Sequence, residues 1–145
     1  MRSRVMVAVV AALVLAAGGC GDDDDGGNGA DPGPPTEADL DGRTFVSTEA
    51  EGFTLVPGTQ VTLTFEGGNV SASAGCNTMS GPYEIDDGTL EVGDMAATLI
   101  GCPDDLQFQD NTLQDLLTGG PGVTLDGEVL TVSGQGMTLT AREQT

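Results

Sequence analysis

The chain of 145 residues carries 23 acidic against 4 basic side chains, a formal net charge of −19, and this excludes nucleic acids as partners, because a negative field repels their phosphates. The sequence contains no His and no Lys, which excludes the Ser–His, Cys–His and Ser–Lys pairs of nucleophilic catalysis and zinc sites built on imidazole. We therefore expect a protein that is not an enzyme.

The first residues predict export. Two arginines precede an unbroken apolar run at residues 5–17, and small residues then lead to Cys20. The run has the length of a signal-peptide core and is too short to span a bilayer, which takes about 20 residues. The arrangement resembles the lipobox of bacterial lipoproteins, in which the cysteine receives a diacylglyceryl group. We predict a lipoprotein signal peptide at residues 1–19 and a lipid anchor on Cys20; the alternatives are an ordinary secretory signal cleaved near Ala17 and an uncleaved anchor.

Residues 20–38 predict a disordered tether. The segment is rich in Asp, Gly and Pro and contains no large apolar side chain, so it cannot bury enough surface to offset the entropy of ordering. Four adjacent aspartates, residues 22–25, repel one another and an anionic lipid surface. A calcium site there is the alternative, but calcium loops alternate ligands with spacers. We predict no metal site and no cofactor, and a domain held off the outer face of the bacterial cell membrane.

Residues 39–143 predict a single domain built mainly from strands. Several segments alternate apolar and polar residues or are rich in β-branched residues, and Gly-containing turns separate many of them. These segments are residues 43–48, 60–66, 69–75, 89–92, 95–101, 128–134 and 136–142.

One segment has helical periodicity instead. Its leucines at positions 106, 113, 116 and 117 fall on one helical face, Pro103 suits the first helical position, and Gly119 suits the stop. We predict one α-helix at about residues 103–118, with its leucines packed on the sheet; a groove for a partner is the alternative use of that stripe. The domain is therefore predicted to be mainly β, a small antiparallel β-barrel-like fold or strongly curled sheet with one helix.

The cysteine count predicts a disulfide bond. Lipidation of Cys20 leaves Cys76 and Cys102, and two remaining cysteines in an exported protein usually pair. Two separately buried thiols are the alternative.

Paired carboxylates are the remaining candidates for catalysis. Glu84 with Asp86, and Asp104 with Asp105, stand close enough in sequence to be considered for acid–base chemistry of the glycosidase type. Both pairs fall in turn or helix-start contexts, where solvated charges are expected. We predict no catalytic residues.

Six stretches of the sequence resemble the META domain, the fold of HslJ-like proteins. They are residues 40–45, 61–65, 74–84, 95–102, 109–113 and 136–142. The most specific motif residues are Gly75, Cys76, Asn77, Thr98, Gly101 and Cys102. The resemblance implies a β-rich, barrel-like domain that is exported, often lipid-anchored, associated with stress responses, secretion or envelope interactions, and without an established catalytic activity.

Together these features predict a non-catalytic, lipid-anchored cell-envelope protein, a monomer that interacts with another envelope protein or a cell-wall component. The alternative is a barrel that binds a small apolar ligand; a structural role without a specific partner is a third reading. A barrel interior filled by its own side chains would count against the ligand. The side chains expected to fill it are Phe45, Phe53, Leu63, Phe65, Leu90 and Leu117.

Overall fold

The computed structural model describes residues 33–145, so the predicted signal peptide and Cys20, with residues 20–32 of the predicted tether, lie outside the described residues. Within residues 33–145, neither helix has the length and apolar character needed to cross a membrane. The elements in chain order are α1 (Glu37–Leu40), β1 (Arg43–Glu51), β2 (Thr62–Glu66), β3 (Asn69–Ser73), β4 (Thr78–Asp86), β5 (Thr89–Val92), β6 (Ala96–Ala97), α2 (Asp104–Thr118), β7 (Gly122–Asp126), β8 (Val129–Gly134) and β9 (Met137–Glu143).

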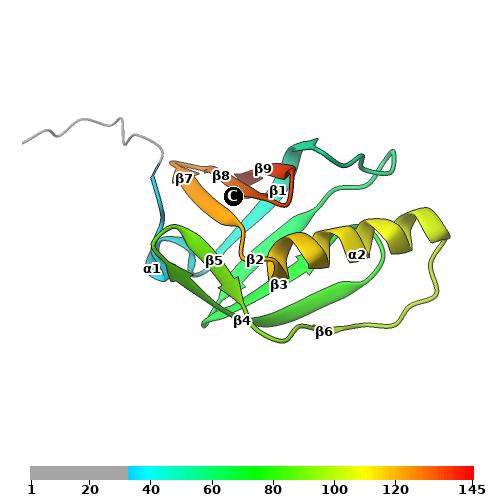
Figure 1. Ribbon diagram of the computed structural model, residues 1–145, viewed down its shortest axis with the longest axis horizontal. Helices are drawn as coiled ribbons and strands as arrows, with labels where there is room; N and C mark the ends of the chain where they lie inside the picture. Colours follow the sequence, from blue (N-terminus) through cyan, green and yellow to red (C-terminus); the bar gives the residue numbers. More distant parts are fainter. Residues whose placement is uncertain (1–32) are drawn as a thin grey trace, which may run out of the picture.

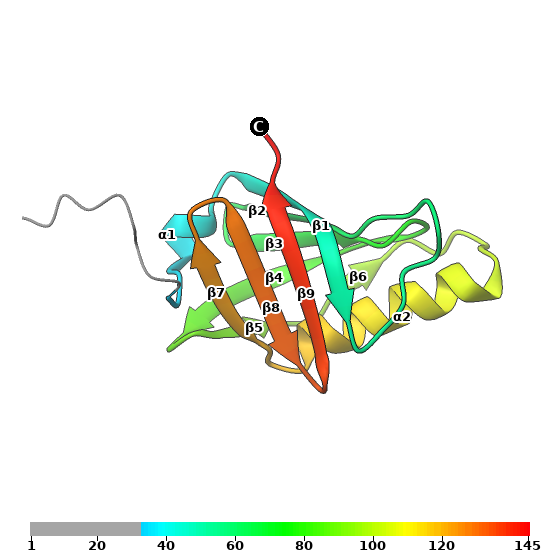
Figure 2. The same ribbon diagram turned by 90° about the horizontal axis from the view of Figure 1, so that it is seen from above.

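Eight of these strands close into an antiparallel barrel (Figures 1 and 2). The hydrogen-bonded order is β3-β2-β1-β9-β8-β7-β5-β4, and the pairing of β3 with β4 completes the ring. The short β6 adds to the side of β4, and the joint between β5 and β7 is narrow, with Thr89 opposite Gly122 as its register pair. The prediction of a mainly β, barrel-like fold with one main helix is confirmed.

Tight turns set the register of three hairpins. Two-residue turns with both residues at positive φ connect β2 to β3, β4 to β5 and β8 to β9. This is the type I′ geometry, whose twist matches that of the strands it joins. The residues concerned are Gly67 and Gly68, Asp87 and Gly88, and Gln135 and Gly136.

Four parts of the sheet differ from the sequence prediction. β4 and β7 were not predicted: β4 contains Gly81 and Pro82, residues that weaken a strand signal, and β7 is five residues long beside a Gly-rich turn. The predicted strand at residues 95–101 is reduced to Ala96–Ala97, because the chain then leaves the sheet toward α2. The predicted strand at residues 69–75 ends at Ser73, before the sharp bend at Gly75, where φ is +109°.

The helix prediction is accurate to one residue. α2 begins at Asp104, and Pro103 is its N-cap residue rather than its first helical residue, while Gly119 is the C-cap as expected. Leu113, Leu116 and Leu117 are fully buried and Leu106 is half-buried. The leucine stripe is therefore core.

The barrel interior is filled by its own side chains. Phe45 and Phe65 pack edge to face with ring centroids 6.1 Å apart, and Phe65 packs against Tyr83 at 5.0 Å. The fully buried side chains include Leu40, Phe45, Val61, Leu63, Phe65, Val70, Leu90, Leu113, Leu117, Leu130 and Leu139, with Phe53 partly buried against them. Burial of this apolar surface is the main stabilising term for the fold.

Residues 33–38, which the sequence pattern assigned to the tether, lie against the barrel. The N–H of Leu125 donates to the carbonyl of Gly33 at 2.9 Å, and the N–H of Ile85 donates to the carboxylate of Glu37 at 2.9 Å. These contacts hold residues 33–38 against the barrel, beside α1 (Figure 1).

Candidate functional site

A disulfide bond joins the bend after β3 to the loop before α2. Cys76 and Cys102 are bonded, with their Cα atoms 6.3 Å apart, within the range usual for disulfides. Gly75 permits the bend, because its φ of +109° is disfavoured for residues with a Cβ and because a Cβ there would lie 3.0 Å from a methyl carbon of Thr59. Both cysteines are half-buried.

Asn77, the next residue, ties the same loop to the barrel. Only 4% of Asn77 is exposed. Its Oδ1 accepts hydrogen bonds from the hydroxyl of Thr98 at 2.9 Å and from the N–H of Ile100 at 2.8 Å. The hydroxyl of Thr98 in turn accepts from the N–H of Thr78 at 3.1 Å. One amide side chain thus holds two residues of the loop in place and, through the hydroxyl of Thr98, joins them to the start of β4.

Asp110 on α2 completes this cluster from the opposite side. One carboxylate oxygen, Oδ2, accepts from the backbone N–H of Asn77 at 2.9 Å and from its side-chain amide at 3.1 Å. The other, Oδ1, is buried without a hydrogen-bond partner among the described residues, and only 3% of Asp110 is exposed. The two Sγ atoms of the disulfide and a carboxylate oxygen of Asp110 all lie within 4.8 Å of one another.

Gln109, beside Asp110 on α2, forms a second buried bridge. Its Oε1 accepts from the N–H of Val56 at 2.6 Å, and its amide donates to the hydroxyl of Thr59 at 2.9 Å and to the carbonyl of Ala74. Five hydrogen bonds made by the side chains of Gln109 and Asp110 therefore connect these two consecutive helical residues to residues 56–77. Satisfied buried polar groups of this kind specify one docking position for the helix.

The structure brings most of the predicted motif residues together. Cys76, Asn77, Thr98 and Cys102 are in direct contact through the disulfide and the hydrogen bonds above, with Gly75 beside them. Gly101 is the exception, because it is exposed and a Cβ added there would meet nothing within 4 Å.

Sequence reasoning missed Asp110 and Gln109 as site residues. The signal was available: three- and four-residue spacing places both positions on the face of α2 that carries Leu106 and Leu113. A polar pair on a leucine stripe indicates a buried hydrogen-bond network rather than a solvated face.

Large apolar side chains are exposed beside this cluster. Leu99 is 97% exposed, Ile100 58% and Phe108 72%. All three lie in residues 99–108, which comprise the loop held by Asn77 and the first turns of α2. Figures 1 and 2 both show the beginning of α2 at the end of the molecule opposite to α1.

The charges near this end are acidic. Asp104 and Asp105 are exposed in the first turn of α2. The arginines of the described chain are used elsewhere: Arg43 donates to Glu143 at 2.6 Å and to the carbonyl of Gly127 at 2.8 Å, and Arg142 lies 3.5 Å from Glu128. The hydrogen bond from Arg43 lowers the pKa of the Glu143 carboxyl below its ordinary value.

The predicted carboxylate pairs do not form a catalytic arrangement. Glu84 and Asp86 are exposed on β4, two residues apart on its outer face, and Asp104 and Asp105 are exposed at the start of α2. Glu84 lines an open hollow together with Tyr83 and Glu91, but Asp86, its predicted partner, does not line that hollow.

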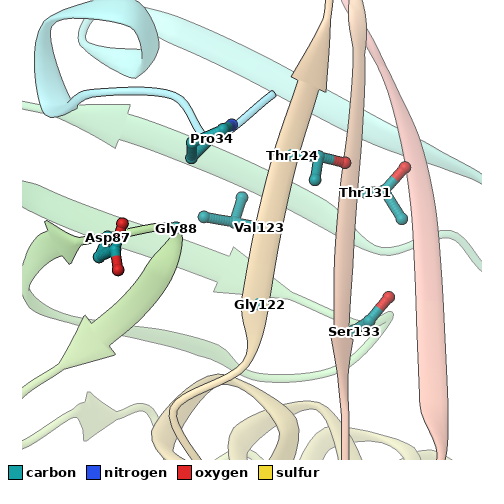
Figure 3. Close-up of a pocket in the computed structure, with 8 residues that line it drawn as sticks. All are labelled: Pro34, Asp87, Gly88, Gly122, Val123, Thr124, Thr131 and Ser133. Carbon is teal, nitrogen blue, oxygen red and sulfur yellow. The ribbon is translucent and has the colours of Figure 1, made fainter. Parts of the chain in front are cut away.

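Hollows on the barrel surface are shallow. One of about 330 Å³ lies between Pro34 and the outer side of β7 and β8, where Thr124, Thr131 and Ser133 present hydroxyl groups (Figure 3). Asp87, on the β4–β5 turn, is its single charged residue. Another of about 580 Å³ lies along β4 and β5 beside Tyr83. Both are open to solvent and outside the filled interior.

Comparisons with known proteins agree on the fold. A family model described as the META domain matches residues 38–145. Two solved structures match the chain: one protein solved by NMR has 27% identity over 74% of this chain and 94% of its own, with a TM-score of 0.63. The other, an NMR structure of a protein from Burkholderia xenovorans, has 23% identity over 100% of this chain and 99% of its own, with a TM-score of 0.64. The search of curated proteins found no match.

Proposed function

Since the chain belongs to the META domain family, we propose that it is a non-catalytic, lipid-anchored module of the bacterial cell envelope that docks onto another envelope protein. The proposed anchor is Cys20, on the basis of the apolar run and small residues before it. The docking surface is the group Leu99, Ile100 and Phe108, which we name the apolar tip.

The exposure of the apolar tip carries this proposal. Three large apolar side chains within ten residues are each more than half exposed, and a group of exposed apolar side chains is typical of a contact surface. A few well-packed side chains at the centre of an interface, often aromatic, supply most of its binding energy.

The tip is held rigidly. The N–H of Ile100 donates to Asn77 at 2.8 Å, and the disulfide fixes Cys102 two residues later. A surface that is ordered before binding loses less conformational entropy when the partner arrives. The disulfide and Asn77 thus act as supports for the tip.

The direction of the tip suits an anchored protein. The described chain begins beside α1, whereas α2 begins at the opposite end (Figures 1 and 2). A protein tethered through its N-terminal segment would present the tip away from its own membrane. With Asp104 and Asp105 beside the tip, the partner surface that fits is an apolar pocket bordered by basic residues.

Site-specific photo-crosslinking in the bacterial host tests this proposal. A crosslinking amino acid at position 99 or 108 should yield a protein adduct of one defined mass. The control is the same amino acid at position 128, which is exposed on the turn between β7 and β8 and should yield no such adduct. The double substitution Leu99→Ser with Phe108→Ser should abolish the adduct of a crosslinker at position 100. Because all of these side chains are exposed, the thermal midpoint should stay within a few degrees of wild type.

Two outcomes would refute docking through the tip. One is an equal yield of adducts from positions 99 and 128; the other is an adduct confined to lipid or glycan. Cys20→Ser separates the anchor from the docking surface: it should move the protein out of the membrane fraction, and an unchanged distribution would refute the anchor alone.

The ligand-binding alternative is not favoured. The interior positions that would surround an apolar ligand are occupied by Phe45, Leu63, Phe65, Leu90 and Leu117, and the hollows described above lie on the outside.

A further inference from the structure

We propose that reduction of the Cys76–Cys102 disulfide converts this cluster into a binding site for a thiophilic divalent cation such as Zn²⁺, with Asp110 as the third protein ligand. The inference concerns the reduced state and does not rest on the docking function proposed above.

The unpartnered carboxylate oxygen is the first observation. Asn77 presents two donors to Asp110, and both are accepted by Oδ2. Oδ1 is buried and has no donor among residues 33–145. A buried carboxyl oxygen without a partner is costly, and a cation is one species that satisfies it. An asparagine at position 110 would offer Asn77 the same kind of acceptor oxygen, so the two hydrogen bonds from Asn77 do not by themselves require a carboxyl group.

The distances are the second observation. The two Sγ atoms and a carboxylate oxygen of Asp110 lie within 4.8 Å of one another. Ligands that share one tetrahedral zinc ion, at about 2.3 Å for sulfur and 2.0–2.2 Å for oxygen, are separated by about 3–4 Å. Rotation of the two cysteine side chains after reduction is sufficient to meet that geometry, and water would take the fourth position.

Formation of the site takes two steps, reduction and metal binding. A reductant of the dithiol class passes two electrons and two protons to the disulfide, which becomes two thiols while the dithiol becomes a disulfide. Binding of Zn²⁺ then releases both thiol protons and leaves two thiolates and one carboxylate on the cation. In the oxidised protein the sulfur atoms are bonded to each other, so we expect cation binding only after reduction.

The surroundings favour entry of a cation. Both cysteines are half-buried rather than enclosed, and Asp104 and Asp105 lie on the adjacent first turn of α2. Neither arginine of the described chain lies in this cluster, because each is paired with a glutamate elsewhere.

Cobalt titration of the reduced protein tests the inference. All samples would carry Cys20→Ser, so that Cys76 and Cys102 are the only thiols, and would be reduced with a phosphine in the absence of oxygen. We expect one Co²⁺ per chain, with thiolate-to-metal charge-transfer and tetrahedral d–d absorption bands that Zn²⁺ abolishes. The oxidised protein should show neither band. Asp110→Asn should weaken the affinity for Zn²⁺ about 10-fold or more, whereas Asp115→Asn, the same change at an exposed position of α2, should alter it less than twofold.

The inference is overturned if the reduced protein shows no charge-transfer band, or if Asp110→Asn binds as tightly as Asp115→Asn. An NMR spectrum of each sample shows whether the reduced chain remains folded. Should reduction unfold it, Zn²⁺ must restore the dispersed spectrum, because metal binding and folding are then coupled; a spectrum that stays collapsed with Zn²⁺ also overturns the inference.

Discussion

Replacement of Asn77 by alanine tests whether the polar cluster, rather than the disulfide alone, holds the loop before α2. The side chain of Asn77 makes hydrogen bonds to the Thr98 hydroxyl (2.9 Å), the Ile100 N–H (2.8 Å) and Asp110 Oδ2 (3.1 Å). Each bond contributes about 1 kcal/mol net to the stability, and the bond to the carboxylate contributes at least as much as the other two. Water can reach Thr98 and Ile100 in the variant, so the penalty stays near this net value.

We expect Asn77→Ala to lower the free energy of unfolding by about 3 kcal/mol, measured by urea unfolding of the oxidised protein. For a domain of about 100 residues, this corresponds to a fall in the thermal midpoint of roughly 12–24 °C. Asn111→Ala is the matched control: Asn111 is exposed on α2 and makes one long side-chain contact of 3.4 Å, so its removal should change stability by less than about 0.5 kcal/mol.

A double-mutant cycle that combines Asn77→Ala with Asp110→Ala measures the interaction energy between these two residues. The two residues are in direct contact, and we expect a coupling energy of about 1 kcal/mol or more between them. A loss below 1 kcal/mol for Asn77→Ala, or additive single losses, would show that the disulfide by itself positions the loop. The reasoning about the cluster would then be wrong.

Two further predictions concern the bend and the acid stability. Gly75→Ala should destabilise the protein by about 1–3 kcal/mol, because alanine is strained at positive φ and its Cβ would contact Thr59. Gly58→Ala is the control and should cost less, because Gly58 is also at positive φ but nothing lies within 4 Å of the new Cβ. Equal urea midpoints for the two variants would contradict the steric part of this explanation. The hydrogen bond from Arg43 depresses the pKa of Glu143 below its ordinary value of 4.5. The stability that this pair contributes is therefore present above that pH and is lost as the pH falls through the depressed pKa. The difference in urea midpoint between wild type and Glu143→Gln should therefore be largest near neutral pH and shrink toward pH 3, and a pH-independent difference would contradict the assignment.

The parts of the fold that sequence patterns predicted are those where one periodicity dominates. Alternation at residues 60–66 corresponds to β2, residues 89–92 are β5, and the leucine spacing predicted α2 to within one residue. β4 was missed because Gly81 and Pro82 interrupt its pattern. Its neighbours on both sides, β3 and β5, supply the pairing that overrides the weak local signal.

The candidate site was predictable only in part. The cysteine count predicted the disulfide, and the family resemblance singled out Asn77 and Thr98. The partner of Asn77 is Asp110 on α2, and only the tertiary fold brings that helix against the bend after β3. The exposure of Leu99 and Ile100 could not be foreseen either, because an apolar run that follows Ala96–Ala97 has the local pattern of a continuing strand.

The buried polar groups that stabilise the loop and the helix are also those that hold the surface proposed for docking. The barrel closes through its own strand pairs, without the loop before α2. Asn77 and the disulfide hold that loop, while Gln109 and Asp110 dock the helix, so these polar contacts are concentrated where the apolar tip is presented. If the cluster exists to fix the tip, Asn77→Ala should reduce crosslinking from position 99 at temperatures where the barrel remains fully folded, because a mobile tip must be ordered on binding. Undiminished crosslinking in a folded Asn77→Ala protein would mean that the cluster serves the barrel alone.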